Sequence, residues 1–249
     1  MKRSLKALLG FDLATTDKEK GKVKDFLFDE ERWVIRYLEA DQGKILPSKQ
    51  VLIPRVFLDQ PEWSKGKFPV KMSKEDIEKC PATDETLPVS RKYEQELAEH
   101  LQLNNYWAVA PPIIGTSAYP PRPIVTPENQ VKEEDVDTNL RSFKEVIGYE
   151  VDTSDGSYGE LTDIIIDDDD WQIVYFVTNS KYTDTEREVM LAIGWIKEIS
   201  YVNQRITLEI DFKNMVHAPE YHPATPVNIE FEKKVYDFYG RNQMNWNIP

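Results

Sequence analysis

The residues of this sequence that could do chemistry begin with a run of acidic side chains. Asp167 to Asp170 are four consecutive carboxylates, and carboxylate oxygens are the hard ligands that Ca²⁺ and Mg²⁺ prefer. Four consecutive residues on a turn point in different directions, however, and the spacing of an EF-hand loop is absent. We therefore expect a solvated turn. Replacing Asp168 and Asp169 by asparagine should leave the melting temperature nearly unchanged, and Ca²⁺ should not raise it.

A second group lies in the segment "HAPEYH", where His217, Glu220 and His222 stand close together. Imidazole and carboxylate groups at short spacing suggest a zinc site or an acid–base site. No helical spacing places the three side chains on one face, so structural or surface histidines are the favoured interpretation.

A third candidate is a pair of aspartates, Asp25 in "GKVKDFLFD" and Asp163 in "GELTDIIID". A carboxylate buried in an apolar strand can have a raised pKa and act as a base. Because the same residue stands in two similar segments, we favour a shared structural role, a hydrogen bond to a turn amide.

Motifs of known chemistry are missing from the sequence. It has no glycine-rich phosphate loop, no nucleophile elbow and no cluster of cysteine and histidine ligands. The one cysteine, Cys80, precedes Pro81 and is expected to be a packing residue. We expect no catalytic, cofactor-binding or metal-binding residue and no cofactor, and we expect that the protein is not an enzyme.

Composition and charge narrow the class of partner. The chain of 249 residues is 40% hydrophobic and 11% aromatic, which predicts folded domains with their own cores. The net charge is −13, and the excess lies in residues 104–249, with 12 basic against 25 acidic residues, whereas residues 1–103 have 19 of each. An acidic half disfavours nucleic acid and anionic membrane as ligands. No apolar run is long enough for a transmembrane helix or a signal peptide, so a cytoplasmic protein is expected.

The elements that position these residues come from an internal repeat. Placing each residue over the one 138 positions later gives nine identities among the 28 positions 10–37, against about two expected from ordinary residue usage. The identical pairs include Gly21 and Gly159, Asp25 and Asp163, and Trp33 and Trp171. We interpret the chain as two homologous domains, residues 1–107 and 143–249, joined by a linker, residues 108–142.

Each copy is expected to be a mainly β domain with helices at its end. Alternating and then continuous apolar residues predict a strand on each side of the acidic turn. The two strands form one hairpin in each copy, at 21–40 and at 159–178. Further strands are predicted at 51–53, 56–59 and 68–72, and at 189–193, 196–202 and 206–210. Helices should begin after the N-cap residues Ser73, Ser90, Asp211 and Asn228. About six short strands in each copy indicate a small antiparallel barrel or rolled sheet.

The segment between the copies is rich in proline. Six prolines fall between positions 111 and 127, which predicts a semi-rigid connector with little regular structure. Apolar side chains in the stretch 104–140, among them Tyr106, Trp107 and Tyr119, predict that part of this stretch lies against one or both domains.

This order of features resembles the PRC-barrel domain family. The features are a glycine followed by a turn aspartate, the segments "DFLFDEERWVIRYLEAD" and "GELTDIIID", the motif "W-x-I-x-Y", and the closing "RKYEQELAEHLQLNNYW". The family includes the cytoplasmic part of the photosynthetic reaction-centre H subunit and the ribosome maturation factor RimM. The resemblance covers about 8–107 and 146–246 and is stronger in the first copy. It implies two tandem six-stranded β-barrels that bind proteins, with no catalytic residues.

Two functions remain open at this stage. The first is a non-catalytic adaptor with paired barrels that bind unidentified protein partners, with peripheral association at the cytoplasmic face of a membrane or photosynthetic complex. The alternative is a protein that binds a small molecule or cation in a cleft between the barrels. That cleft would be lined by carboxylates such as Glu160 or Asp163, and the protein could act as an enzyme there.

Overall fold

The computed structural model describes residues 1–17, 19–41, 50–83, 89–106, 124–125, 139–183, 186–223 and 227–241. The chain divides into two compact units. One contains Ala7–Ile113 and Val131–Lys144, and we call it the 7–113 unit. The other contains Met1–Lys6, Ile114–Gln130 and Glu145–Pro249, and we call it the 145–249 unit. The short segment Met1–Lys6 thus stands before the 7–113 unit in the sequence but belongs to the 145–249 unit. In the same way, Val131–Lys144 stands before residue 145 but belongs to the 7–113 unit.

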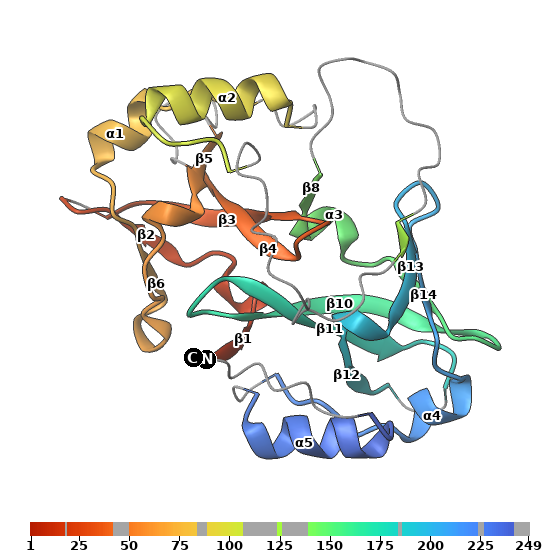
Figure 1. Ribbon diagram of the computed structural model, residues 1–249. Coiled ribbons are helices and arrows are strands. Elements are labelled where there is room, and N and C mark those ends of the chain that lie inside the picture. The colour runs from red at the N-terminus through yellow and green to blue at the C-terminus, as the bar shows by residue number, and fades with distance from the viewer. Residues whose placement is uncertain are drawn as a thin grey trace, which may run out of the picture. The chain divides into compact units, whose positions relative to one another are not determined.

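The 7–113 unit is built on a mixed sheet (Figure 1). Its strands are β2 (Asp12–Ala14), β3 (Glu19–Asp29), β4 (Val34–Asp41), β5 (Gln50–Pro54), β6 (Lys67–Pro69) and β8 (Leu140–Ser142). They pair in the order β6–β2–β3–β4–β5, with β8 antiparallel to the far end of β3. Only the pairing of β2 with β6 is parallel within this unit's described strands. Single 3-10 turns occupy Arg55–Phe57 and Trp63–Lys65, and helices α1 (Lys74–Lys79) and α2 (Arg91–His100) follow.

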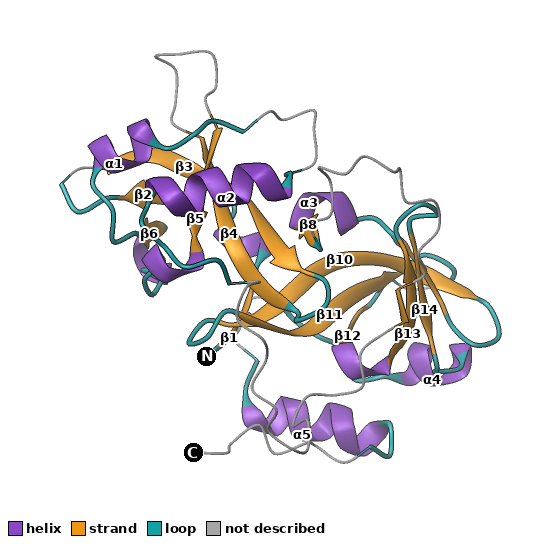
Figure 2. Ribbon diagram, turned by 45° about the horizontal axis from the view of Figure 1, so that its top comes forward, coloured by secondary structure: helices purple, strands orange, loops and turns teal. Residues whose placement is uncertain are grey.

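The 145–249 unit repeats this plan and adds further strands to it (Figure 2). Its strands are β1 (Lys2–Ser4), β7 (Ile124–Val125), β9 (Glu150–Asp152), β10 (Ser157–Asp167), β11 (Gln172–Ser180), β12 (Glu188–Ala192), β13 (Ile196–Ser200) and β14 (Arg205–Leu208). They pair in the order β12–β11–β10–β9–β14–β13–β7, with β1 antiparallel to β10. Helices α4 (Phe212–His217) and α5 (Ile229–Phe238) close the unit. Two short elements, the 3-10 turn Lys6–Leu8 and helix α3 (Phe143–Val146), cross the boundaries between units.

The protein is thus mainly β, as expected, but the two barrels are not confirmed. Among the described residues, the strand pairings of each unit give an open mixed sheet and do not close into a ring. After β5 the chain makes a 3-10 turn at Arg55–Phe57 where a strand was predicted at 56–59, and after β12 it makes one at Ile193–Trp195. These turns interrupt the pairing that a continuous ring of strands would need.

The two long hairpins are held by the residues that recur in the sequence. Trp33 and Trp171 follow the acidic turns with left-handed backbone, φ 54° and 62°, and both side chains are buried. Asp29 closes the first turn by accepting hydrogen bonds from the amides of Glu31 and Arg32, both at 3.0 Å. Gly159 has a separate reason to recur, because a Cβ there would lie 1.7 Å from the carbonyl oxygen of Asn179.

The four predicted N-caps are confirmed. The side chains of Ser73, Ser90, Asp211 and Asn228 each accept a hydrogen bond from the amide three residues later, which satisfies a donor that the first helical turn leaves free. Each of the longer helices α2 and α5 buries one face that includes a glutamate. The predicted connector is mostly outside the described residues, including Trp107, Tyr119 and all six of its prolines.

Candidate functional site

A buried carboxylate fixes the amino-terminal strand to the 145–249 unit. Asp163 is 4% exposed and stands in β10 beside an irregularity in the pairing with β11. One of its oxygens accepts a hydrogen bond from the hydroxyl of Ser4 at 2.5 Å. The other accepts from the amides of Lys6 at 3.0 Å and Ile164 at 2.7 Å. Every oxygen of this carboxylate is thus engaged by the chain itself.

Asp25 makes the corresponding contacts in the 7–113 unit. It is 4% exposed, and one oxygen accepts from the hydroxyl of Ser142 at 2.5 Å. The other accepts from the amides of Lys144 at 3.2 Å and Phe26 at 2.8 Å. Each partner lies 138 positions from its counterpart at Asp163.

Backbone pairing follows the same register in the two units. We call Met1–Lys6 and residues 139–144 the arms. Lys2 pairs with Asp167 and Ser4 with Ile165 in β10, just as Leu140 pairs with Asp29 and Ser142 with Leu27 in β3. Asp25 and Asp163 therefore each bind, through hydrogen bonds, a strand from a distant part of the sequence to the sheet.

The expectation of a shared hydrogen-bonding role for these two aspartates is confirmed, although the donors differ from the predicted ones. They belong to an arm and to the next residue of the strand rather than to the hairpin turn. Burial raises the pKa of Asp25 and of Asp163, while the hydrogen bonds from Ser142 and Ser4 act in the opposite direction. A general base needs a substrate proton within reach, and here internal donors occupy both oxygens.

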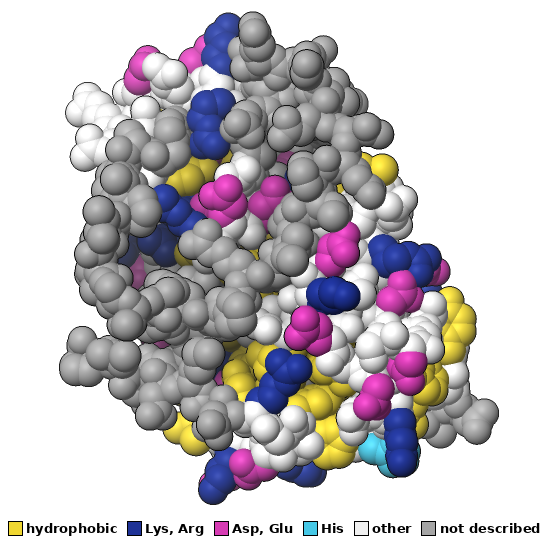
Figure 3. Space-filling model, turned by 45° about the vertical axis from the view of Figure 1, so that its right-hand side comes forward, with side chains coloured by type: hydrophobic (Ala, Val, Ile, Leu, Met, Phe, Trp, Pro, Cys, Tyr) yellow, Lys and Arg dark blue, Asp and Glu magenta, His cyan; other side chains and the backbone are white. Residues whose placement is uncertain are grey.

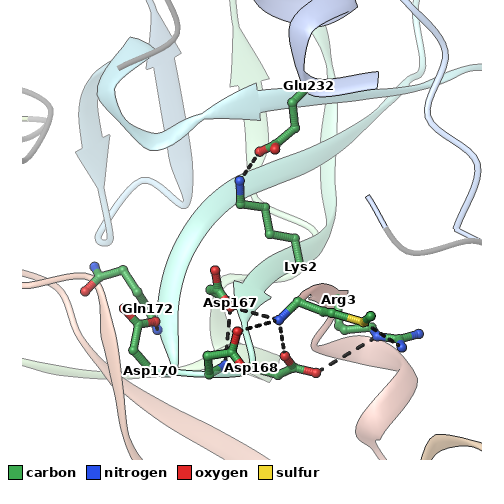
Figure 4. A network of polar contacts seen from close by, with 9 residues as sticks. Lys2, Arg3, Asp167, Asp168, Asp170, Gln172 and Glu232 are labelled. Carbon is green, nitrogen blue, oxygen red and sulfur yellow. Dashed lines mark hydrogen bonds and ion pairs between the residues drawn. The ribbon is translucent and has the colours of Figure 1, made fainter. Parts of the chain in front are cut away.

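The acidic turn meets the amino group of Met1 (Figure 4). Oxygens of Asp167, Asp168 and Asp169 lie within 4.8 Å of one another, the spacing of a cation site. The Met1 nitrogen lies 2.5 Å from Asp168, 3.0 Å from Asp169 and 3.1 Å from Asp167. Burial lowers the pKa of this ammonium, but the three carboxylates outweigh that effect and raise it to about 10. The ammonium thus lies where these carboxylates would hold a metal ion.

The expectation of a solvated turn is wrong for Asp168. Its side chain is buried, and its amide donates to the Met1 carbonyl oxygen at 2.9 Å. Glu30, which stands 138 positions earlier, is also buried and pairs with Arg141 of the other arm at 2.9 Å. The residues of the turn alone favour exposure to solvent, whereas an arm from elsewhere in the chain lies against the turn.

Replacing Asp168 by asparagine should therefore lower the free energy of unfolding by about 1 to 2 kcal/mol, because the partly buried hydrogen bond from the Met1 ammonium loses its charged acceptor. Asp170→Asn is the matched control, since Asp170 is exposed and its oxygen accepts a local hydrogen bond from the amide of Gln172 that asparagine can also accept. Urea unfolding of both variants measures the difference. Equal stability of the two would contradict a structural role for Asp168.

A second pair of buried acids was missed by the sequence analysis. Glu94 and Glu232, on α2 and α5, are 0% and 2% exposed and stand 138 positions apart. Glu94 accepts hydrogen bonds from Tyr37 at 2.9 Å and from Tyr106 at 2.7 Å. Burial raises the pKa of Glu94, and the bonds from Tyr106 and Tyr37 act against that. Tyr106, which was expected to lie against a domain, thus packs within the 7–113 unit.

Glu232 accepts a hydrogen bond from Tyr175 and pairs with Lys2 of the amino-terminal arm (Figure 4). Tyr37 and Tyr175 form one of the identical pairs of the repeat. The recurrence of a glutamate at the same offset was the signal that could have identified this second pair.

The histidine segment does not form a metal centre. Among the described residues, His217, Glu220 and His222 do not come close enough to share an ion. His217 Nδ1 lies 2.7 Å from the carbonyl oxygen of Lys213, one turn earlier on α4. His217 and His222 are exposed, as expected, and all three residues line a cavity of the 145–249 unit. Cys80 is buried and its thiol lies 3.3 Å from the Asp76 carbonyl oxygen, as expected for a packing residue.

Comparison with known proteins identifies one domain. No curated protein matches the chain. A model of the PRC-barrel domain family matches residues 139–215, the copy in which the resemblance was judged weaker. The matched segment runs from the second arm through β14 to helix α4, so its first strand, β8, lies in the 7–113 unit. Residues 139–215 thus contain a PRC-barrel domain.

Proposed function

We propose that the protein is a non-catalytic adaptor that binds other proteins through two related PRC-barrel units in one chain. The match of residues 139–215 to the PRC-barrel family carries this proposal, because the relatives that the sequence resembles act through protein contacts. The same resemblance suggests a cytoplasmic protein that associates peripherally with a membrane or photosynthetic complex. Among the described residues, no helix combines the length and apolar character that a bilayer span requires.

Recurrence of tertiary contacts supports the duplication. Both units contain a clasped arm, a buried tyrosine–glutamate pair and a left-handed tryptophan after the hairpin turn, each at the same offset of 138 residues. Duplication gives one chain two similar surfaces. Two weak contacts on one chain combine through high effective concentration when both sites can be reached together.

The use of the buried acids supports a non-catalytic role. Asp25, Asp163 and Glu94 have the raised pKa values that can mark a catalytic acid or base. Each of them accepts hydrogen bonds from groups of the same unit. These shifts therefore belong to a structural network.

The surface supports protein partners rather than nucleic acid. Residues 104–249 carry 12 basic and 25 acidic residues, and a phosphate backbone needs the opposite charge. Exposed apolar side chains include Val56 and Val202, which are 60% and 61% exposed. We expect the acidic half to steer partners in a salt-dependent way and apolar residues to supply most of the affinity.

The test is affinity purification of the tagged full chain, followed by direct binding measurements with each purified partner. Binding should weaken at least several-fold when Val56→Ser and Val202→Ser are combined, and the association rate should fall as salt rises. Ser157→Ala, a replacement of an exposed polar residue, is the control and should leave binding unchanged. If no purified protein binds the full chain directly, the adaptor proposal is wrong.

A second candidate, the binding of a small molecule, is favoured by one observation, the cavity beside α5 in the 145–249 unit.

A further inference from the structure

A cavity of about 620 Å³ lies in the 145–249 unit beside helices α4 and α5. Its wall comes from the residue before β12, the segment after α4, and α5. Surveyed ligand sites have volumes of about 300 to 1,000 Å³, so this cavity has room for a small organic molecule.

The charged groups around the cavity are mainly cationic or basic. They are Arg187, Lys234, His217 and His222, with Glu220 as the single acidic member among the lining residues. This reverses the balance of residues 104–249, in which acidic residues outnumber basic ones by 25 to 12. A local cluster of the minority charge favours an anionic group at this place.

Arg187 gives this wall a defined shape. Its guanidinium donates to the carbonyl oxygens of Val216 at 2.6 Å and Ala218 at 2.9 Å, and so holds the segment after α4. Its Nε atom also lies 3.8 Å from a carboxylate oxygen of Glu220. The one acidic side chain of the wall thus has a cation of its own, while Lys234 forms no ion pair with any residue that the structure describes, so its charge can meet a ligand.

Apart from Asn228, the rest of the wall is apolar. Tyr221 is buried at 4% exposure, and its ring centroid lies 6.3 Å from that of Phe231. Val227 is buried, while Phe238 is 38% exposed at the rim. In the lower part of the face drawn in Figure 3, hydrophobic side chains lie beside lysine or arginine side chains, acidic side chains and a histidine. Aromatic walls beside cationic groups suit a flat apolar body that carries a negative charge.

We propose that this cavity binds a small organic anion, a carboxylate or phosphate monoester carried on an apolar body about the size of one aromatic ring. A long polyanion would meet the acidic surface of the same half, whereas a compact ligand with one charged group would meet only the cavity wall. The proposal does not depend on the adaptor function.

The first copy of the repeat keeps part of this chemistry, because Lys49 and Lys79 stand where Arg187 and His217 do, but it lacks the rest. Glu96 stands where Lys234 does, Asp84 where His222 does, and His100 where Phe238 does. The basic residues Lys234 and His222 are therefore particular to the second copy, whereas the buried acids recur in both. A feature that the fold alone required would be expected at both places.

Protein-observed NMR titration of the full chain with benzoate tests the proposal. Saturable binding is expected at the cavity residues with a Kd of about 1 mM, an ordinary affinity for a ligand of this size. Benzamide, which has the same ring without the charge, should bind at least several-fold more weakly, and benzylamine should not bind. Phenyl phosphate in place of benzoate shows which anionic group is preferred.

Lys234→Glu, which introduces the residue of the first copy, should weaken benzoate binding about tenfold or more. Lys233→Glu is the matched control, because it makes the same charge change on the next residue of α5 at a side chain that does not line the cavity. Phe238→Ser should also weaken binding by removing apolar wall. Equal effects of Lys233→Glu and Lys234→Glu, equal binding of benzylamine, or no saturable benzoate binding would each overturn the proposal.

Discussion

Asp163→Ala should lower the free energy of unfolding by about 3 to 5 kcal/mol. The substitution removes the acceptor for three donors, the Ser4 hydroxyl and the amides of Lys6 and Ile164. Each buried donor left without a partner costs about 1 to 3 kcal/mol. The loss also releases the arm that this carboxylate holds on β10, so the effect should exceed that of an ordinary surface substitution.

Urea denaturation measures this loss of stability, and three further variants serve as comparisons. Asp25→Ala should be similarly costly, because Asp25 holds the second arm in the same way. Asp170→Ala, at an exposed position of the acidic turn, should cost far less. Asp163→Asn should be milder than alanine, since an amide oxygen can still accept from the two backbone amides and the amide nitrogen can donate to Ser4.

The pH dependence of the asparagine variant has a definite sign. Burial raises the pKa of Asp163 above its ordinary value of 3.8, so the folded protein binds a proton more tightly than the unfolded chain. Stability from this group is then fully present below 3.8 and falls as pH rises toward the folded pKa. Asparagine does not titrate, so Asp163→Asn should become less unfavourable relative to the wild type across that window and level off above it. A difference that is constant with pH would contradict a raised pKa at Asp163.

Local structure was predictable because it depends on neighbouring residues. The hairpins, most strands and the four N-caps follow from alternation, turn residues and capping side chains, which act within a few positions of one another. The recurrence of Asp25 as Asp163 correctly indicated a structural hydrogen bond, because an unrelated catalytic role is not expected to appear at the same place in both copies.

The arms could not be predicted in the same way. Strands of three residues such as Lys2–Ser4 and Leu140–Ser142 carry almost no periodic signal, and their partners lie more than a hundred residues away in the sequence. Burial of Asp168 follows from one of these contacts and was missed with it. Glu94 and Glu232 were missed because a glutamate on an amphipathic helix ordinarily faces solvent, and only the packing of a tyrosine hydroxyl against it shows that it is buried.

Glu232→Ala should lower the free energy of unfolding by about 3 to 5 kcal/mol, the usual cost of breaking a buried ion pair from one side. It leaves Tyr175 without its acceptor and Lys2 without its counter-ion, and the side chains of Glu232 and Lys2 are only 3% and 17% exposed. Glu232→Gln keeps an acceptor for the tyrosine and should cost less than alanine. Glu230, exposed on the same helix, gives the control, and Glu230→Ala should leave stability nearly unchanged.

A variant without either charge separates the effect of the ion pair from the effect of burial. Lys2→Met combined with Glu232→Gln removes both charges and should recover part of the loss seen with Glu232→Ala, because no unpaired charge stays buried. Glu94→Ala should be as costly as Glu232→Ala in the other unit, since Glu94 accepts from both Tyr37 and Tyr106. If Glu232→Ala were no more destabilising than Glu230→Ala in urea unfolding, the arm would not be held through α5. The clasp at Asp163 would then be the main side-chain contact that secures β1.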